Sequence, residues 1–220
     1  MSVESLSNAW KRRSISLLWA AMGLALVLAA GCGGVPRNYY YGLQVPALPV
    51  ASDPKTDYVL GVERFQAPEL LRDDRIVYYQ SPTELNYYEY HRWASDPAGM
   101  LSDITMQWIN GLGIFAQVRS LPAREPADYV LAGRVFNFEE ADYKEGGKAR
   151  VSLELSLLRS HDRKVVWSAR RLVETPFQGG GVPGVAIAFN SATQQLLREV
   201  LPGLVAQVEQ DFRASQGQSR

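Results

Sequence analysis

The sequence predicts a single α+β domain in which two helices pack on one face of a mostly antiparallel sheet. Residues 150–157 alternate between apolar and polar side chains, which is typical of a strand with one solvent-exposed face. Residues 97–113 and 185–212 carry apolar side chains at helical spacing. Because runs of strands are separated by single helices, the order of elements favours an α+β fold.

Short strands are expected in the first half of the chain. Residues 39–44 and 58–65 have the composition of strands, the second more clearly than the first. Residues 75–80 and 84–90 are two aromatic runs separated by the turn-forming residues 81–83. We therefore expect the last two runs to form a β-hairpin.

The first helix is expected to begin at the dipeptide Asp96-Pro97. Aspartate is a favoured N-cap, and proline suits the first turn, where no N–H donor is needed. Apolar residues then recur every three or four positions, and these are Leu101, Ile104, Trp108 and Leu112. The spacing predicts an amphipathic helix over 97–113.

Three longer strands should follow this helix. Residues 128–139 are rich in β-forming side chains, and the alternating residues 150–157 form the next strand. The charged residues 161–164 are expected to form a turn. Residues 164–175 should then pair back as the third strand.

A loop over 176–183 should lead into the C-terminal helix. Its predicted apolar stripe consists of Val185, Phe189, Leu196, Val200, Leu204, Val208 and Phe212. Pro202-Gly203 is expected to kink or break the helix, because proline cannot donate the helical hydrogen bond. The polar residues 214–220 are expected to fray.

Cys32, the only cysteine, lies at a position typical of lipid attachment. An uncharged stretch over 14–31 ends in Leu-Ala-Ala-Gly just before it and follows the basic residues 11–13. This layout is that of a bacterial secretory signal. The sequence around Cys32 resembles the lipobox of bacterial lipoproteins, in which the thiol is acylated and becomes the new N-terminus. We therefore predict a signal peptide over 1–31 and a covalent lipid on Cys32.

Two other interpretations of this segment stay open. Its 18 uncharged residues could barely span a bilayer as an uncleaved helix, at about 1.5 Å per residue. An ordinary signal peptide would be cut nearby and would leave Cys32 as a free thiol. Gly33 stands where an aspartate would resemble an inner-membrane retention signal. The sequence therefore favours the outer membrane, with the domain on its periplasmic face.

The remaining chain is long enough for one domain. Removing residues 1–31 from 220 leaves 189. We expect a lipidated N-terminus, tether and short strand over 32–56, the folded domain over 57–213 and a polar tail over 214–220. The 23 basic and 23 acidic residues balance, so the charge implies no nucleic-acid partner.

No catalytic or cofactor motif is complete. Residues 179–184 fit the pattern G-x-G-x-x-G, but Pro183 removes a backbone donor and no parallel βαβ unit surrounds them. A mobile connecting loop is favoured, with a partner-contact loop as the alternative. His91 and His161 alone cannot form a zinc site, and no G-x-S-x-G elbow occurs. We predict a protein that is not an enzyme and that has no metal and no cofactor besides its lipid.

Aromatic residues are concentrated in the predicted hairpin and just after it. They are Tyr78, Tyr79, Tyr87, Tyr88, Tyr90 and Trp93. Packing within the sheet and core is one interpretation, because tyrosine is a favoured strand residue. An exposed interface is the other, because tyrosine and tryptophan supply a large contact area with a polar tip. Neighbours on a strand face opposite ways, so both can hold at once.

A resemblance to a known family is carried by several segments. They are YYYGL at 39–43, RIVYYQSP at 75–82, LNYY at 85–88, RWA at 92–94 and ADY at 127–129. These segments resemble the ABC-type transport auxiliary lipoproteins, which are the paraquat-inducible protein C-like partners of Mce-type lipid transport systems. The similarity covers nearly all of the mature chain.

The resemblance implies a location, partners and candidate residues. In such systems an ABC transporter lies in the inner membrane, Mce-domain proteins bridge the periplasm, and the lipoprotein docks the far end of that bridge. Tyr87, Tyr88, Arg92 and Trp93 are then candidates for partner binding or for a structural role. Trp93 in particular is expected to be a core anchor at the entrance of the first helix. A homo-oligomer is one of the assemblies to consider.

Two other functions compete with lipid transport. One is a general envelope-integrity or outer-membrane assembly lipoprotein that uses the same fold as a docking module. The other is a periplasmic hydrolase, which would need a nucleophile that no sequence motif reveals. Neighbouring genes for an ABC ATPase, a permease and an Mce protein would favour transport.

Overall fold

The computed structural model describes residues 36–46, 53–142, 146–177 and 179–218. Apart from Pro36 and Arg37, these residues belong to one compact unit, Asn38–Arg220. The described elements include two long helices, α2 (Pro97–Gly111) and α3 (Gly181–Gln218), and the short 3-10 helix η1 (Glu69–Leu71). The predicted signal peptide and Cys32 lie outside the described residues.

Eight strands form one sheet in the part of the chain that is described, which confirms the α+β class. The strands are β1 (Tyr39–Tyr41), β2 (Val59–Val62), β3 (Arg75–Tyr79), β4 (Leu85–Trp93), β5 (Gln117–Ser120), β6 (Tyr129–Ala141), β7 (Lys148–Arg159) and β8 (Val165–Pro176). The predicted hairpin is confirmed as β3 and β4. The predicted strands of the second half are confirmed as β6, β7 and β8. β5 was not expected.

The long strand β6 organises the sheet. Along one edge it pairs with β7 in antiparallel fashion over its whole length. Along the other edge it pairs with two separate parallel strands, β2 near its start and β3 near its end. The short strands β5 and β1 then extend the sheet from β2 and β4.

The sheet is mixed, whereas the sequence predicted a mostly antiparallel one. The antiparallel pairs, β3–β4, β6–β7 and β7–β8, join strands that follow one another along the chain. The parallel pairs, β1–β4, β2–β5, β2–β6 and β3–β6, join strands that do not. Short connections force the antiparallel direction, but distant strands can pair either way.

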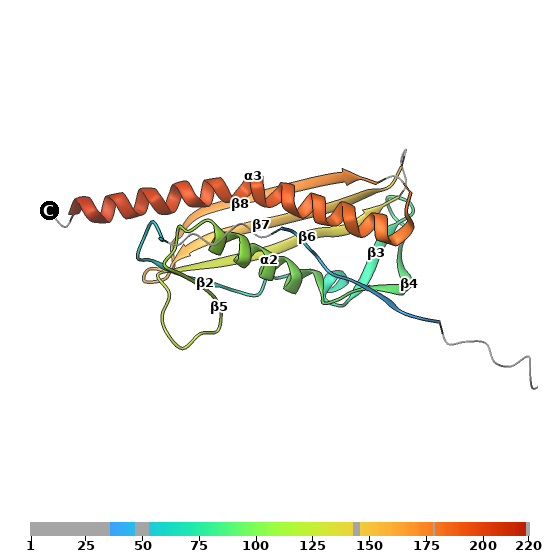
Figure 1. Cartoon of the computed structure of the whole chain (residues 1–220), viewed down its shortest axis with the longest axis horizontal. Coiled ribbons are helices and arrows are strands. Elements are labelled where there is room, and N and C mark those ends of the chain that lie inside the picture. The colour runs from blue at the N-terminus through green and yellow to red at the C-terminus, as the bar shows by residue number, and fades with distance from the viewer. Residues whose placement is uncertain (1–35, 47–52, 143–145, 178, 219–220) are drawn as a thin grey trace, which may run out of the picture. The chain divides into compact units, whose positions relative to one another are not determined.

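Both helices cover the same face of the sheet, as predicted. α3 packs along β7 and β8, while α2 contacts β5, β6 and α3 (Figure 1). The opposite face carries polar side chains: Arg134, Glu154 and Arg170 lie next to one another in the strand register. On that face the guanidinium of Arg170 covers the ring of Phe136, 3.6 Å from its centroid.

The core lies between the sheet and the helices. The alternating residues Val151, Leu153, Leu155 and Leu157 are all buried, as predicted, but Ser152 on the face expected to be exposed is buried as well. At one end of the core, Trp93 of β4 packs edge-to-face against Phe138 of β6 and Phe189 of α3, at 5.1 Å between ring centroids in each pair. Trp93 is only 1% exposed. Its predicted role as a core anchor is confirmed.

The start of α2 follows the predicted capping pattern. The side chain of Asp96 accepts a hydrogen bond from the backbone N–H of Gly99 at 2.9 Å, and Pro97 is the first helical residue. Asp96 is also paired with the guanidinium of Arg64. The helix ends at Gly111, with Leu112 as its C-cap.

The C-terminal helix extends further than predicted. Of the two outcomes expected at Pro202, a kink or a break, the break does not occur: α3 continues through Pro202, and the flanking Leu201 and Leu204 are buried. Gly203 gives the indole of Trp167 its space, since a Cβ there would lie 2.9 Å from Nε1. The segment predicted to fray is helical as far as Gln218, and Ser215 in it accepts a hydrogen bond from the hydroxyl of Tyr58 at 3.2 Å.

Replacing Trp93 should test how much the core depends on its ring. Trp93→Ala would leave a cavity between Phe138 and Phe189 and should lower the free energy of unfolding by about 3–5 kcal/mol. Urea unfolding followed by circular dichroism would measure the change. Tyr40→Ala is the matched control, because this side chain is 62% exposed and its loss should leave stability nearly unchanged. Equal stability of both variants would contradict the core role.

Candidate docking site

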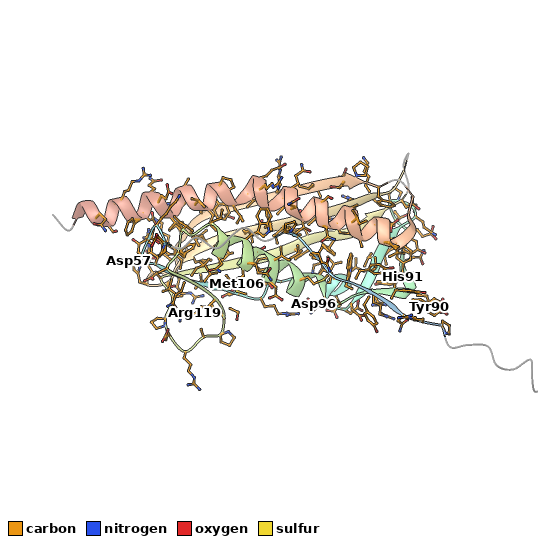
Figure 2. The ribbon with its side chains drawn as sticks, viewed as in Figure 1. Asp57, Tyr90, His91, Asp96, Met106 and Arg119 are labelled. Carbon is orange, nitrogen blue, oxygen red and sulfur yellow. The ribbon has the colours of Figure 1, made fainter. Side chains whose placement is uncertain are left out.

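Aromatic side chains gather where β1 joins the edge of β4. The parallel register places Tyr39 beside His91 and Tyr41 beside Trp93. The ring of His91 stacks with those of Tyr39 and Tyr41, at 5.2 and 5.7 Å between centroids. The hydroxyl of Tyr41 also lies 2.8 Å from Nδ1 of His91, within hydrogen-bond distance. His91 is therefore the centre of the group, and Figure 2 labels it next to Tyr90 at this end of the unit.

A bulge in β4 extends the group toward β3. Arg92 pairs with Arg75 and Tyr87 pairs with Val77, so four residues of β4 lie opposite Ile76 alone. Tyr88 thereby contacts His91 edge-to-face at 5.9 Å and Tyr78 at 4.8 Å. Ring contacts join Tyr39, Tyr41, Tyr78, Tyr88 and His91. We call these five residues, together with their strand neighbours Tyr40 and Tyr90, the aromatic surface; the two neighbours make no ring contact with the other members and point to the other face of their strands.

Part of the aromatic surface is open to solvent. Tyr39, Tyr40 and Tyr90 are 51%, 62% and 37% exposed. They are three of the six large hydrophobic side chains that are exposed among the described residues. Exposed tyrosines that cluster in this way have the composition of a protein interface.

A buried carboxylate holds the aromatic surface in place. Glu140 of β6 is 3% exposed and accepts a hydrogen bond from the hydroxyl of Tyr88 at 2.8 Å. Burial raises the pKa of Glu140, and the hydrogen bond from Tyr88 offsets part of that rise. Burial and the same hydrogen bond also raise the pKa of the Tyr88 hydroxyl. Tyr88 is therefore a neutral, fixed donor, and its ring is pre-organised for contact.

The four residues proposed from the sequence have different surroundings. Trp93 is in the core, and Arg92 forms an ion pair with Asp74 at 3.1 Å, beside the bulge. Tyr87 lies under the guanidinium of Arg75, which is 3.9 Å from the ring centroid. Of the four, Tyr88 alone belongs to the aromatic surface. Partner binding by any of them stays a prediction.

The most exposed members of the surface were not proposed from the sequence. Tyr39 and Tyr40 were interpreted as part of a short strand, which is correct for the backbone. Their exposure results from the parallel pairing of β1 with the edge of β4, which no local pattern reveals. The run of three tyrosines so close to Cys32 was the available signal.

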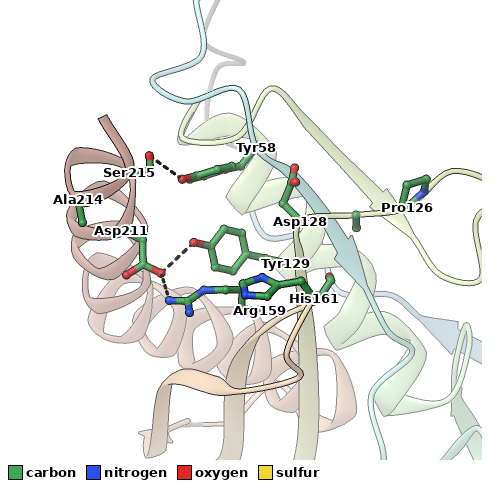
Figure 3. Close-up of a pocket in the computed structure, with 11 residues that line it drawn as sticks. Tyr58, Pro126, Asp128, Tyr129, Arg159, His161, Asp211, Ala214 and Ser215 are labelled. Atoms are coloured by element: carbon green, nitrogen blue, oxygen red, sulfur yellow. Dashed lines mark hydrogen bonds and ion pairs between the residues drawn. The ribbon is translucent and has the colours of Figure 1, made fainter. Parts of the chain in front are cut away.

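A pocket of about 750 Å³ lies at the opposite end of β6, beside the C-terminal turns of α3 (Figure 3). Its central group is the carboxylate of Asp211. This group accepts hydrogen bonds from Tyr129 at 2.8 Å, Arg159 at 3.1 Å and Gln207 at 3.0 Å. Burial acts to raise the pKa of Asp211, but these hydrogen bonds outweigh it and the pKa is lowered.

The polar groups of this pocket are mostly occupied with one another. Asp211 joins α3 to β6 through Tyr129 and to β7 through Arg159. His161, the histidine nearest to them, is largely exposed in the turn between β7 and β8. Among the described residues no three metal-ligating side chains come together. The arrangement fastens the end of α3 to the sheet.

The glycine-rich loop has the geometry of a connection. Gly179, Gly180 and Gly181 all have positive φ, a conformation that glycine adopts readily. The loop leaves β8, which pairs with β7 in antiparallel fashion, whereas a dinucleotide site needs a parallel βαβ unit. A contact between this loop and a partner stays a prediction.

Comparisons with known proteins agree with this architecture. A Xanthomonas campestris protein of known crystal structure, described under the family model DUF330, is 28% identical in sequence. The match has a TM-score of 0.69 and covers 79% of this chain and 98% of that one. An uncharacterized protein of known structure is 17% identical, with a TM-score of 0.58 over 75% of this chain and 97% of that one. A search of curated proteins finds no match.

The described part of the chain contains no helix with the length and hydropathy needed to cross a bilayer.

The model of the ABC-type transport auxiliary lipoprotein component family matches residues 41–201, which is well over half of the chain. The matched region includes most of the aromatic surface, both helices as far as Leu201, and the whole of β6, β7 and β8. The chain therefore belongs to the ABC-type transport auxiliary lipoprotein component family.

Proposed function

We propose that this protein is a lipid-anchored component of an Mce-type phospholipid transport system, held on the periplasmic face of the outer membrane. In this proposal it acts as a docking subunit and not as an enzyme. The aromatic surface contacts the Mce-domain protein that reaches across the periplasm from the ABC transporter. The family membership supports the transport role in general, and the aromatic surface supports the docking role.

One observation carries the docking part of the proposal. Half of the exposed large hydrophobic side chains of the described residues belong to β1 and β4, and one of them, Tyr39, stacks on His91 in the pre-organised aromatic group. Tyr39 follows Cys32 by seven residues, so the tether can extend at most about 25 Å at about 3.5 Å per residue. A lipid on Cys32 would keep the aromatic surface near the membrane, where the far end of an Mce bridge would arrive.

The lipid anchor can be tested by replacing the acylated residue. Cys32→Ser should abolish palmitate labelling and leave a soluble or unprocessed protein, because no other cysteine can take its place. The melting temperature of the folded domain should not change, because Cys32 precedes the domain expected over 57–213. Labelling that persists in this variant would contradict the anchor.

A second variant at the same site tests the choice of membrane. Gly33→Asp keeps the acylated cysteine but places an aspartate after it, as in the inner-membrane retention signal. Labelling should persist, while the protein should move from the outer-membrane to the inner-membrane fraction of a density gradient. A wild-type protein already found in the inner membrane would overturn the proposed location.

Docking through the aromatic surface can be tested by photo-crosslinking in cells. A photoreactive residue in place of Tyr40 should crosslink to an Mce-domain protein, because this side chain is exposed within the proposed contact. The same residue in place of Val165 is the control, since Val165 is 51% exposed but lies at the other end of the sheet. Mass spectrometry of the crosslinked products identifies the partner.

The same experiment separates the competing functions. Crosslinks from position 40 to an outer-membrane assembly protein would favour the general docking lipoprotein instead of transport. Equal crosslinking from positions 40 and 165 would remove the aromatic surface from the proposal. A homo-oligomer stays a prediction, which crosslinks between two copies of this chain would support.

A further inference from the structure

The outer helix α3 carries a second apolar stripe that packing on the sheet does not require. The sheet-facing stripe predicted from the sequence includes Val200, Leu204 and Val208, all of which are buried. Leu197, Leu201 and Val205 form a parallel stripe one position away, at the same spacing of four residues. A helix that packs on a sheet alone needs one apolar stripe and is polar elsewhere.

The second stripe faces a groove between α3 and the last turn of α2. The groove has a volume of about 450 Å³, and its floor is formed by Trp108, Leu197 and Leu201, all buried. Leu112, Val205 and Ala206 form its sides. The indole Nε1 of Trp108 is shielded from solvent, so this floor offers an occupant no hydrogen-bonding atom.

The rim of the groove carries a cation without an ion-pair partner. Arg198 and Glu209 are the charged residues that line it. The carboxylate of Glu209 is paired with Lys55 at 2.9 Å and with Arg213 at 3.2 Å, whereas Arg198 is exposed and forms no ion pair with the described residues. The uncompensated charge at this rim is therefore positive.

Pro202 lines the groove inside α3, four residues after Arg198. Because proline has no N–H, it cannot donate the helical hydrogen bond to the carbonyl of Arg198. The guanidinium of Arg198 is therefore the polar group beside the apolar channel that a ligand can use, which suits a ligand with an anionic group and a hydrocarbon chain.

The groove is open on one side, which suits one hydrocarbon chain lying along α3. Its volume of about 450 Å³ includes space that faces solvent, so the groove covers one side of such a chain and does not enclose it. From Leu197 to Glu209 the helix rises about 18 Å, which gives the groove an elongated form. A partner helix fits less well, because α2 ends at Gly111 and contributes little more than one turn to the wall.

We propose that the groove between α2 and α3 binds one acyl chain of a phospholipid, with the phosphate at Arg198. The hydrocarbon character of the ligand follows from the groove itself, whereas its identity as a phospholipid rests on the proposed transport function. Desolvation of the apolar floor drives binding, and the charge of Arg198 favours an anionic headgroup. This chain would then handle lipid directly besides docking a partner.

Photolabelling of the full-length lipidated protein tests the proposal. The probe is a phosphatidylglycerol with a diazirine in one acyl chain, supplied in phosphatidylcholine nanodiscs that hold the protein. Labelled peptides should map to residues 197–209. Ala206→Phe should abolish this labelling with an unchanged melting temperature, because Ala206 is exposed and its replacement fills the groove. Ala214→Phe, the same change on the same helix outside the groove, should leave labelling intact.

A second pair of measurements tests the headgroup contact. Arg198→Gln should weaken labelling by the phosphatidylglycerol probe but not by a diacylglycerol that carries the same diazirine chain. An equal effect on both probes would overturn the role of Arg198.

Labelling that is absent from α3, or unchanged in Ala206→Phe, would overturn the site as a whole. So would a crosslink from position 206 to an Mce-domain protein, which would assign the groove to a partner. Crosslinks from Tyr40 report on docking independently of these results.

Discussion

The contact among Trp93, Phe138 and Phe189 determines where the β3–β4 hairpin lies. Backbone pairing between the hairpin and β6 covers only two residue pairs, Tyr78 with Glu140 and Tyr79 with Ala141. The three rings add a contact at the end of β4, because they join β4, β6 and α3 in one buried cluster, with Phe138 and Phe189 at 4.4 Å. The aromatic surface is built on this hairpin, so its geometry depends on a core contact.

The packing of the hairpin against the core also explains why the adjacent residues Arg92 and Trp93 have different roles. Trp93 enters the core, while Arg92 stays outside and pairs with Asp74 at the other end of the bulge. The bulge in β4 brings Tyr88 and His91 into contact, and the carboxylate of Glu140 accepts a hydrogen bond that holds the hydroxyl of Tyr88. Contact residues held in this way lose little entropy on binding, which favours a stable interface over an adaptable one.

Sequence patterns predicted what depends on local spacing. The start of α2 could be predicted from Asp96-Pro97, and the buried face of β7 from the alternation of its side chains.

The parallel strand pairs could not be predicted, because the pairing of strands that are distant in the sequence leaves no periodic pattern in it. β5 is four residues long and lacks alternation, so it was missed. Pro202 was expected to kink or break α3; it does not break the helix, because one lost hydrogen bond is outweighed by burial on both sides. The candidate site was found in part: Tyr88 was proposed, but the exposure of Tyr39 and Tyr40 depends on a tertiary pairing.

The two apolar features of the surface differ in a way that separates their roles. The aromatic surface consists of rigid rings with polar tips, which can pair with the polar groups of a protein partner. The groove between α2 and α3 has a floor of aliphatic side chains and one indole, with its polar groups confined to the rim.

The two helices that form the groove differ in length. α3 extends about ten turns in all, at 3.6 residues per turn, whereas α2 ends after about four. The second stripe of α3 therefore passes beyond the cover that α2 provides. An apolar stripe left partly uncovered is unfavourable in water unless a ligand completes it, and a hydrocarbon chain does so without needing any hydrogen bond from the floor.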